Sequence, residues 1–254
     1  FGHQIQLKRC DQFTGLIKIV QNGPEIMKIA SQKNVCSIFF VFFHLFSQFC
    51  KVKQLNNVMN DFSKYSAIII GAGDATGSAL CKKFASNGYK VCAVRRPGNL
   101  DKFKPLENDI VETGGWIKCF GVDAREEESI QQLFKHVEEE VAPIDVVIFN
   151  PGANVFFPIE DTTSRVFKKV WEMAAFGGFL TGKEATKYMK KRNRGSIFFT
   201  GATASMRGGS GFSAFSSAKF ALRALAQSMA RELGPQGIHV AHFVIDGAID
   251  TAFI

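Results

Sequence analysis

The chain has 254 residues, of which 46% are hydrophobic and 21% charged, values typical of a globular protein with one large core. Its formal net charge of +8 is unevenly spread, because residues 1–58 carry seven basic and two acidic side chains whereas the remainder carries 24 and 21. We do not expect a domain of nearly balanced charge to bind nucleic acid. The six cysteines form no CxxC pair and have no histidine at metal-ligand spacing, which argues against a metal site and favours a reducing, cytoplasmic location.

Residues 1–58 show no sustained periodicity, and we interpret them as an N-terminal extension that is disordered or non-native. Their most apolar stretch, residues 35–50, is shorter than the roughly 20 residues that a membrane span needs and contains His44, Ser47 and Gln48. We therefore predict no membrane partner, with a signal-anchor or membrane-contacting segment at 35–50 as the alternative. The folded domain is predicted to span residues 59–254.

Within this domain short apolar runs alternate with longer amphipathic stretches. Strands are expected at 66–70, 90–94, 116–120, 144–149, 196–200 and 238–245, and helices at 75–88, 126–142, 163–191 and 211–234. The stretch between the second and third strands is interpreted as a polar segment containing Pro97 and Pro105. Strands that are apolar on both faces and separated by helices predict an α/β fold, a Rossmann-type doubly wound parallel sheet. No closing element follows the last strand, so we expect the fold to be C-terminally incomplete.

A glycine-rich turn, GAGDATG, lies between the first strand and the first helix. At this junction small residues let the pyrophosphate of a dinucleotide approach backbone N–H groups at the helix N-terminus. No GK[ST] sequence follows, which excludes a P-loop. The residues predicted to bind the cofactor here are Gly71, Gly73, Asp74, Ala75, Thr76 and Gly77.

The end of the second strand indicates which dinucleotide is bound. An acidic side chain there binds the ribose 2′-hydroxyl of NAD, whereas arginine accommodates the 2′-phosphate of NADP. This strand ends in Arg95 and Arg96 with no carboxylate. We therefore predict NADP(H) over NAD(H), with two solvated arginines as the alternative interpretation.

Together with later motifs the glycine turn resembles the short-chain dehydrogenase/reductase family, over about residues 62–254. The sequence VDA at 122–124 is similar to an Asp-containing turn of that family, which implies that Asp123 and Ala124 lie at the adenine. FNPGAN at 149–154 is similar to its NNAG motif and retains Asn150 and Gly152. The resemblance implies a small-molecule substrate bound beside a nicotinamide.

Two further motifs extend the resemblance to the end of the chain. FSSAK at 215–219 lies on the family's YxxxK motif, which implies that Lys219 holds the nicotinamide ribose. DGAIDT at 246–251 lies on its PGxxxT loop, which implies cofactor contacts by Gly247 and Thr251. The resemblance also implies a homodimer or homotetramer formed through the helices at 163–191 and 211–234.

The departures from the family pattern fall on the catalytic groups. Phe215 stands at the tyrosine position, Ala202 at the serine position and Ala174 or a neighbour at the asparagine position, so that of the tetrad only Lys219 remains. This set resembles an atypical subgroup with Phe for Tyr and an incomplete glycine motif. Neither phenylalanine nor alanine can give a proton or a hydrogen bond to a carbonyl oxygen.

These residues leave three functions open. The first is an NADP(H)-dependent oxidoreductase acting on a carbonyl or alcohol, in which water, a substrate group or Lys219 is a non-standard proton donor. The second is a catalytically inactive dinucleotide-binding protein, a sensor or a partner subunit. The third, a Rossmann-like methyltransferase, would not need the arginine pair. His239 and His242 are further candidates, which we predict to share one face of the last strand.

Overall fold

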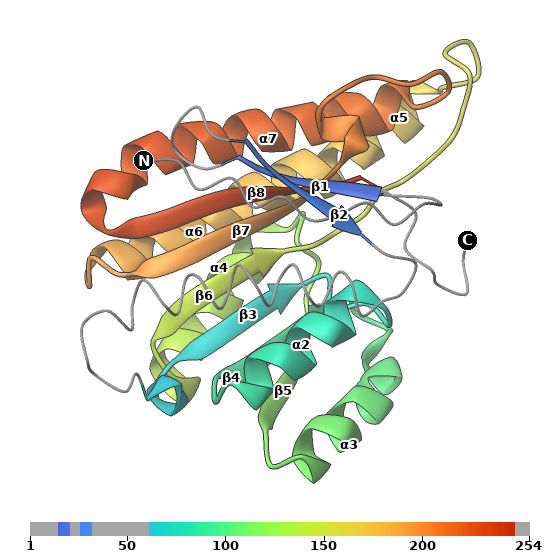
Figure 1. The fold of residues 1–254 in the computed structure, drawn as a ribbon. Coiled ribbons are helices and arrows are strands. Elements are labelled where there is room, and N and C mark those ends of the chain that lie inside the picture. The colour runs from blue at the N-terminus through green and yellow to red at the C-terminus, as the bar shows by residue number, and fades with distance from the viewer. Residues whose placement is uncertain (1–14, 21–25, 32–60, 247–254) are drawn as a thin grey trace.

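The computed structural model describes residues 15–20, 26–31 and 61–246, which form one eight-stranded sheet with helices on both faces (Figure 1). The strand order is β2-β1-β8-β7-β6-β3-β4-β5. All pairings from β3 to β8 are parallel, which confirms the predicted Rossmann-type doubly wound fold. The six parallel strands are β3 (Ser66–Ile70), β4 (Lys90–Arg95), β5 (Trp116–Gly121), β6 (Ile144–Phe149), β7 (Gly195–Ala202) and β8 (Ile238–Asp246).

Two strands precede this core in the chain. β1 (Gly15–Val20) and β2 (Ile26–Ser31) pair antiparallel, and β1 pairs antiparallel with β8, with Leu16 opposite Asp246. They give β8 a partner on its outer side, where it would otherwise present an open edge. Their presence differs from our expectation of no regular structure in residues 1–58. The apolar stretch 35–50 and its membrane alternative lie outside the described residues.

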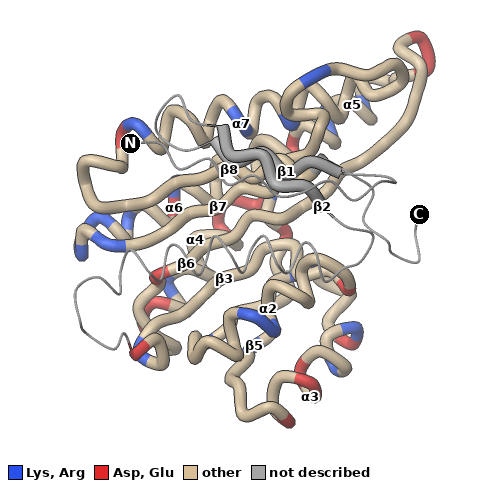
Figure 2. Tube along the Cα trace, viewed as in Figure 1, with Lys and Arg blue, Asp and Glu red and all other residues tan. Residues whose placement is uncertain are grey.

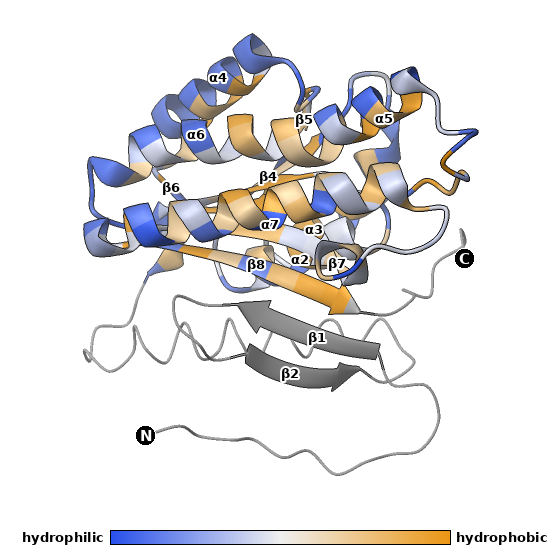
Figure 3. Cartoon of the chain, turned by 90° about the horizontal axis from the view of Figure 1, so that it is seen from above, coloured by the Kyte–Doolittle hydropathy of each residue, from blue (hydrophilic) through white to orange (hydrophobic). Residues whose placement is uncertain are grey.

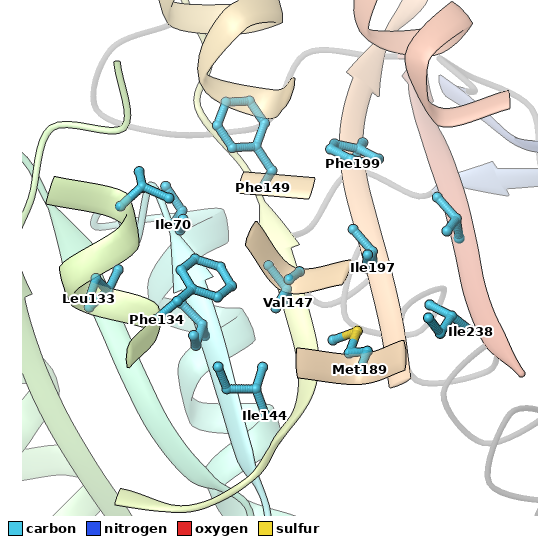
Figure 4. Close-up of a cluster of buried hydrophobic side chains, with 14 of the residues drawn as sticks. Ile70, Leu133, Phe134, Ile144, Val147, Phe149, Met189, Ile197, Phe199 and Ile238 are labelled. Atoms are coloured by element: carbon cyan, nitrogen blue, oxygen red, sulfur yellow. The ribbon is translucent and has the colours of Figure 1, made fainter. Parts of the chain in front are cut away.

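Helices cover the two faces of the sheet because strand residues alternate in direction. Ala67 and Ile69 of β3 pack toward α2 (Thr76–Ser86) and α3 (Lys104–Glu112). Ile68 and Ile70 point to the opposite face, where Figure 4 shows the cluster that includes Phe134, Phe149 and Phe199. That face is covered by α4 (Glu127–His136), α6 (Gly177–Lys190) and α7 (Ser213–Leu233).

Helix α3 lies in the stretch that we interpreted as a polar segment. Pro105 is in the first turn of the helix, where a missing N–H costs nothing. Leu106 and Ile110, one turn apart, are buried against α2. Pro105 therefore marks the start of a helix and not its absence.

The long helix predicted at 163–191 is present but changes its winding. α5 (Ser164–Trp171) continues into a π-helical turn, Glu172–Phe176, and then into α6. Such turns insert one residue into a helix and are frequent at functional sites. The position predicted for the missing catalytic asparagine, Ala174, lies in this turn.

Charge and hydropathy agree with a folded domain whose helices each bury one side. Basic and acidic residues are interspersed over the described fold (Figure 2), and hydrophobic colour concentrates where α7 lies against β8 (Figure 3). Among the described residues no helix combines the length and apolar character that crossing a membrane requires. A cytoplasmic location stays a prediction.

Candidate active site

The strand order reverses between β3 and β6, and the glycine turn lies at this point. In open α/β sheets ligands bind at such a switch point, beyond the carboxyl ends of the strands. The Asn150 amide Nδ2 donates to the Gly71 carbonyl oxygen at 3.0 Å and joins the two strand ends. Gly71 has φ +81°, and a Cβ there would lie 2.9 Å from the Pro151 nitrogen, so only glycine fits.

The rest of the turn is shaped for close approach by a ligand. A Cβ at Gly77 would lie 2.5 Å from Ala72 Cα, so this glycine is required by the protein itself. A Cβ at Gly73 would meet no atom of the described residues within 4 Å, and this residue is exposed. Ala75, the N-cap of α2, makes no side-chain capping hydrogen bond, and the first turn, which begins at Thr76, holds no acidic residue. A helix N-terminus left in this state favours an anion such as a pyrophosphate.

The two arginines at the end of β4, of which Arg95 is its last residue and Arg96 follows it, are in different environments. Arg95 is almost buried: its Nε donates to the Ala72 carbonyl oxygen at 2.5 Å, and its guanidinium also pairs with the exposed carboxylate of Asp74. Arg96 is exposed. Arg96 is therefore the more accessible of the two arginines, and the predicted contact with a 2′-phosphate stays a prediction.

Asp123 and Ala124 follow β5, where adenine contacts are predicted. Both carboxylate oxygens of Asp123 accept hydrogen bonds from the Arg125 guanidinium, at 2.9 and 2.6 Å. These hydrogen bonds hold the pKa of Asp123 below its usual value. Ala124 packs against the core cluster beneath α6, and its carbonyl lies against Gly177. The adenine role of the pair stays a prediction.

Lys219 is the buried centre of the site. Its Nζ donates to the carbonyl oxygens of Thr200 at 2.9 Å and Pro151 at 3.1 Å, which ties α7 to the ends of β7 and β6. The side chain is 2% exposed, and burial lowers the pKa of Lys219 from 10.5 to about 8. An ammonium has three N–H groups, so the two carbonyls leave one donor for a ligand.

Phe215 and Ala202 lie around this lysine. Phe215 is one helical turn before Lys219, whose Nζ is 5.8 Å from the centroid of the ring. Ala202 ends β7 and donates its backbone N–H to Ser205 Oγ at 3.1 Å. Ala174 is fully buried in a small cluster with Ala214 and Ala218 of α7. The positions of the three lost side chains therefore carry no group able to exchange a proton.

The prediction that the two histidines of β8 share one face is wrong. They are three residues apart, so the period of two directs them to opposite faces. His239 contacts Phe198 on the α2 side, whereas His242 has the parity of Ile238 and Val240, which face α7. The His242 ring occupies the space that glycine leaves at position 201, since a Cβ there would lie 2.1 Å from its Cε1.

Other site residues are placed only in part. Gly152 is exposed, with nothing within 4 Å of the Cβ it would carry. Asn154 and Phe156 follow it, and Phe156 packs edge-on against Phe212 before α7, with centroids 5.2 Å apart. No motif or spacing in the sequence predicts this contact between two loops. Gly247 and Thr251 lie outside the described residues, and their roles stay predictions.

A parallel sheet with a switch point, a glycine turn beneath it and a buried lysine beside it defines a dinucleotide-binding α/β protein. The comparisons with known proteins identify its family. A family model described as short chain dehydrogenase matches residues 65–254. The chain therefore belongs to the short-chain dehydrogenase family.

Individual relatives agree with this assignment. The uncharacterized oxidoreductase YuxG of Bacillus subtilis is 30% identical over 197 residues, which are 76% of this chain but only 28% of that protein's length. A short-chain dehydrogenase from Rhodopseudomonas palustris superposes with a TM-score of 0.68 at 53% identity and covers 70% of this chain and 83% of that one. A metagenomic short-chain oxidoreductase solved in complex with NADP, at 22% identity and a TM-score of 0.65, shares the fold over 69% of this chain and 79% of its own.

Proposed function

We propose that the chain is an NADP(H)-dependent oxidoreductase of the short-chain dehydrogenase type, from an atypical subgroup in which Lys219 is the non-standard proton donor. Its substrate is a small carbonyl compound or the corresponding alcohol. The observation that carries the proposal is the environment of Lys219, which is buried, hydrogen-bonded to two carbonyl oxygens and next to Phe215. No carboxylate pairs with its Nζ among the described residues, so burial alone acts on its charge.

The residues present fit a nicotinamide dinucleotide. The open space at Gly73 and Gly152 and the uncapped start of α2 accept a pyrophosphate, and Arg96 supplies charge for a 2′-phosphate. A metagenomic relative of the same fold is in complex with NADP, which supports this choice. When bound, the reduced nicotinamide supplies a hydride to the substrate carbon. The remaining contacts are assigned to Asp123, Ala124, Asn150, Lys219, Gly247 and Thr251.

The protein's task is then to place one proton on the substrate oxygen. With Phe215 and Ala202 at the usual donor positions, the ammonium of Lys219 is the acid that remains. As the carbonyl carbon gains a hydride, the oxygen gains a proton from Nζ, and the neutral amine takes a proton back from solvent. A group whose pKa is about 8 is charged at neutral pH yet gives up its proton far more readily than an ordinary lysine.

The pH dependence of turnover tests the role of Lys219. We expect carbonyl reduction to fall above pH 8, where the ammonium loses its proton, and alcohol oxidation to rise over the same range. The measurement is kcat for NADPH consumption with a panel of carbonyl compounds from pH 6 to 10. Lys219→Met is expected to lower kcat by about 100-fold or more.

Lys219→Arg separates acid catalysis from positive charge. Arginine keeps the charge but does not release a proton in this pH range, so its rate should be as low as that of Lys219→Met. Full activity of Lys219→Arg with an unchanged profile would contradict the proposal. Tight NADPH binding by the unmodified chain without turnover on any substrate would support the binding-only alternative instead.

We also propose that the chain forms a homodimer or homotetramer through the helices of residues 163–191 and 211–234. Four large apolar side chains on these helices are about 40% exposed, and a second copy could cover them. They are Phe167, Trp171, Phe179 and Phe220. Sedimentation of the purified chain as a monomer at micromolar concentration would contradict this.

A further inference from the structure

Three contacts hold the side chain of Arg95 in place, and no sequence motif predicts them. Its Nε donates to the Ala72 carbonyl oxygen at 2.5 Å, and its guanidinium carbon lies 4.6 Å above the ring centroid of Phe103. The third contact is an ion pair with the carboxylate of Asp74, which lies in the glycine turn. The side chain of Arg95 is 9% exposed, whereas that of Asp74 is 72% exposed.

The exposed carboxylate stands out because of its position. Sheets that prefer NAD place an acidic group at the ribose 2′-hydroxyl, and it comes from the end of the second strand. In this chain the corresponding strand, β4, ends in two arginines, and the carboxylate is supplied by the glycine turn opposite. Because Asp74 and Arg95 form an ion pair, a ribose 2′ group bound at the end of β4 would be within reach of both side chains.

We propose that Asp74 is a specificity-determining residue. It contacts the 2′ position of the cofactor's ribose and opposes the preference of Arg95 and Arg96 for a 2′-phosphate. It accepts a hydrogen bond from the 2′-hydroxyl of NAD(H), and it competes with the 2′-phosphate of NADP(H) for Arg95. The chain then binds both dinucleotides, and Asp74 reduces the preference for NADP(H) over NAD(H) that the arginines create. This inference rests on the proposed function, because it concerns the same cofactor.

Charge explains the direction of the effect. A phosphate monoester carries about −1.5 to −2 charges at neutral pH. Placed beside Asp74 it meets a like charge, and it gains Arg95 fully only if the existing ion pair gives way. A 2′-hydroxyl has no charge and gains an acceptor. Removing the carboxylate charge should therefore favour the phosphorylated ligand and disfavour the unphosphorylated one.

The test uses the full chain and two small ligands that differ only at the 2′ position, 2′,5′-ADP and AMP. In Asp74→Asn, which keeps the shape of the side chain, we expect calorimetry to show 2′,5′-ADP binding about tenfold tighter and AMP binding about threefold weaker. Asp74 is exposed, so the variant should fold normally. The matched control is Asp109→Asn, which breaks another exposed ion pair, with Lys82 at 2.5 Å, and should change neither affinity.

The outcomes separate this inference from the proposed function. Equal affinities of the unmodified chain and Asp74→Asn for both ligands, or a parallel shift of the two, would overturn the role of Asp74 and leave the proposed function standing. An unmodified chain that binds neither ligand, nor NADPH, nor NADH would overturn both.

Discussion

The two ends of the candidate site satisfy their polar groups differently. Around the glycine turn the side chains are paired: Asn150 with the Gly71 carbonyl, Arg95 with Asp74, and Asp123 with Arg125. Around Lys219, within the described part of the chain, several buried polar atoms lack a hydrogen-bond partner. They are Thr200 Oγ1, Ser213 Oγ, Ser216 Oγ, Arg223 Nε and both ring nitrogens of His242.

This contrast indicates which end of the site has its polar side chains paired before a ligand binds. Buried polar atoms without partners cost roughly 1–3 kcal/mol each, so they persist where something other than stability is selected. Lys219, a buried charge with no carboxylate beside it among the described residues, belongs to the same region. The rigid end of the site is the glycine turn, whose side chains are paired. The reacting end is the surroundings of Lys219, which carry the buried polar atoms without partners.

The largest expected effect at the reacting end comes from restoring the tyrosine and serine hydroxyls that this chain lacks. In the double variant Phe215→Tyr/Ala202→Ser we expect carbonyl reduction to rise about 100-fold or more, because a tyrosine hydroxyl regains a lysine neighbour and the serine regains its hydrogen bond to the carbonyl oxygen. NADPH oxidation with the carbonyl panel measures it.

The matched control is Phe220→Tyr, which adds the same hydroxyl to an exposed ring on α7 and should leave the rate unchanged. A double variant that binds NADPH normally but gains no rate would show that the reacting end no longer holds a carbonyl in the position the fold implies.

Two glycines of the turn test the rigid end. Gly77→Ala puts a methyl group 2.5 Å from Ala72 Cα, a contact with backbone that cannot move aside. We expect it to lower the thermal midpoint by several degrees and NADPH affinity by about tenfold, since overpacking costs about 1–3 kcal/mol. Differential scanning calorimetry and NADPH titration measure the two effects.

Gly73→Ala is the partner of that experiment, because nothing lies within 4 Å of the added methyl group. Its thermal midpoint should stay that of the unmodified chain while NADPH affinity still falls, as the methyl group meets only the cofactor. Undiminished affinity in Gly73→Ala would mean that no pyrophosphate approaches this turn.

Much of the rigid end could be predicted from the sequence because its signals are local. The six strands were visible as runs apolar on both faces, and Gly71 to Gly77 stand together in the chain. Helix α3 was missed because the stretch with Pro97 and Pro105 reads as a polar segment, although Pro105 lies in the first turn of the helix. β1 and β2 were missed because β1 pairs with β8, more than 200 positions away, and β2 joins the sheet through β1.

At the reacting end the sequence predicts only which catalytic side chains of the family are missing. That Phe215 and Ala202 replace a tyrosine and a serine follows from motif position, but what surrounds Lys219 does not. Its acceptors are backbone carbonyls, which leave no trace in residue identity. The packing of His242 over Gly201 joins two strands through the absence of a side chain, which no spacing rule reveals. Nor could the sequence tell that Arg95 is occupied by Asp74 while Arg96 is exposed.

The smallest expected effect concerns His242 and the stability of the reacting end. Burial, with Lys219 and Arg223 nearby, lowers the pKa of His242 from 6.5 to about 3 in the folded chain. Between these values the unfolded chain binds a proton that the folded chain does not, so stability is lost as the pH falls below about 6.5. From pH 7.5 to pH 5 this group alone should lower the thermal midpoint by about 5 °C.

His242→Leu removes the titrating ring, keeps the site apolar and should flatten this part of the pH dependence, as followed by circular dichroism on heating. Phe243→Leu, which removes a buried ring of the same strand that carries no titrating group, serves as the matched control and should leave the slope unchanged. A slope that is the same in His242→Leu and in the unmodified chain would mean that His242 finds a partner on folding that holds its proton. The reacting end would then be as well satisfied as the glycine turn.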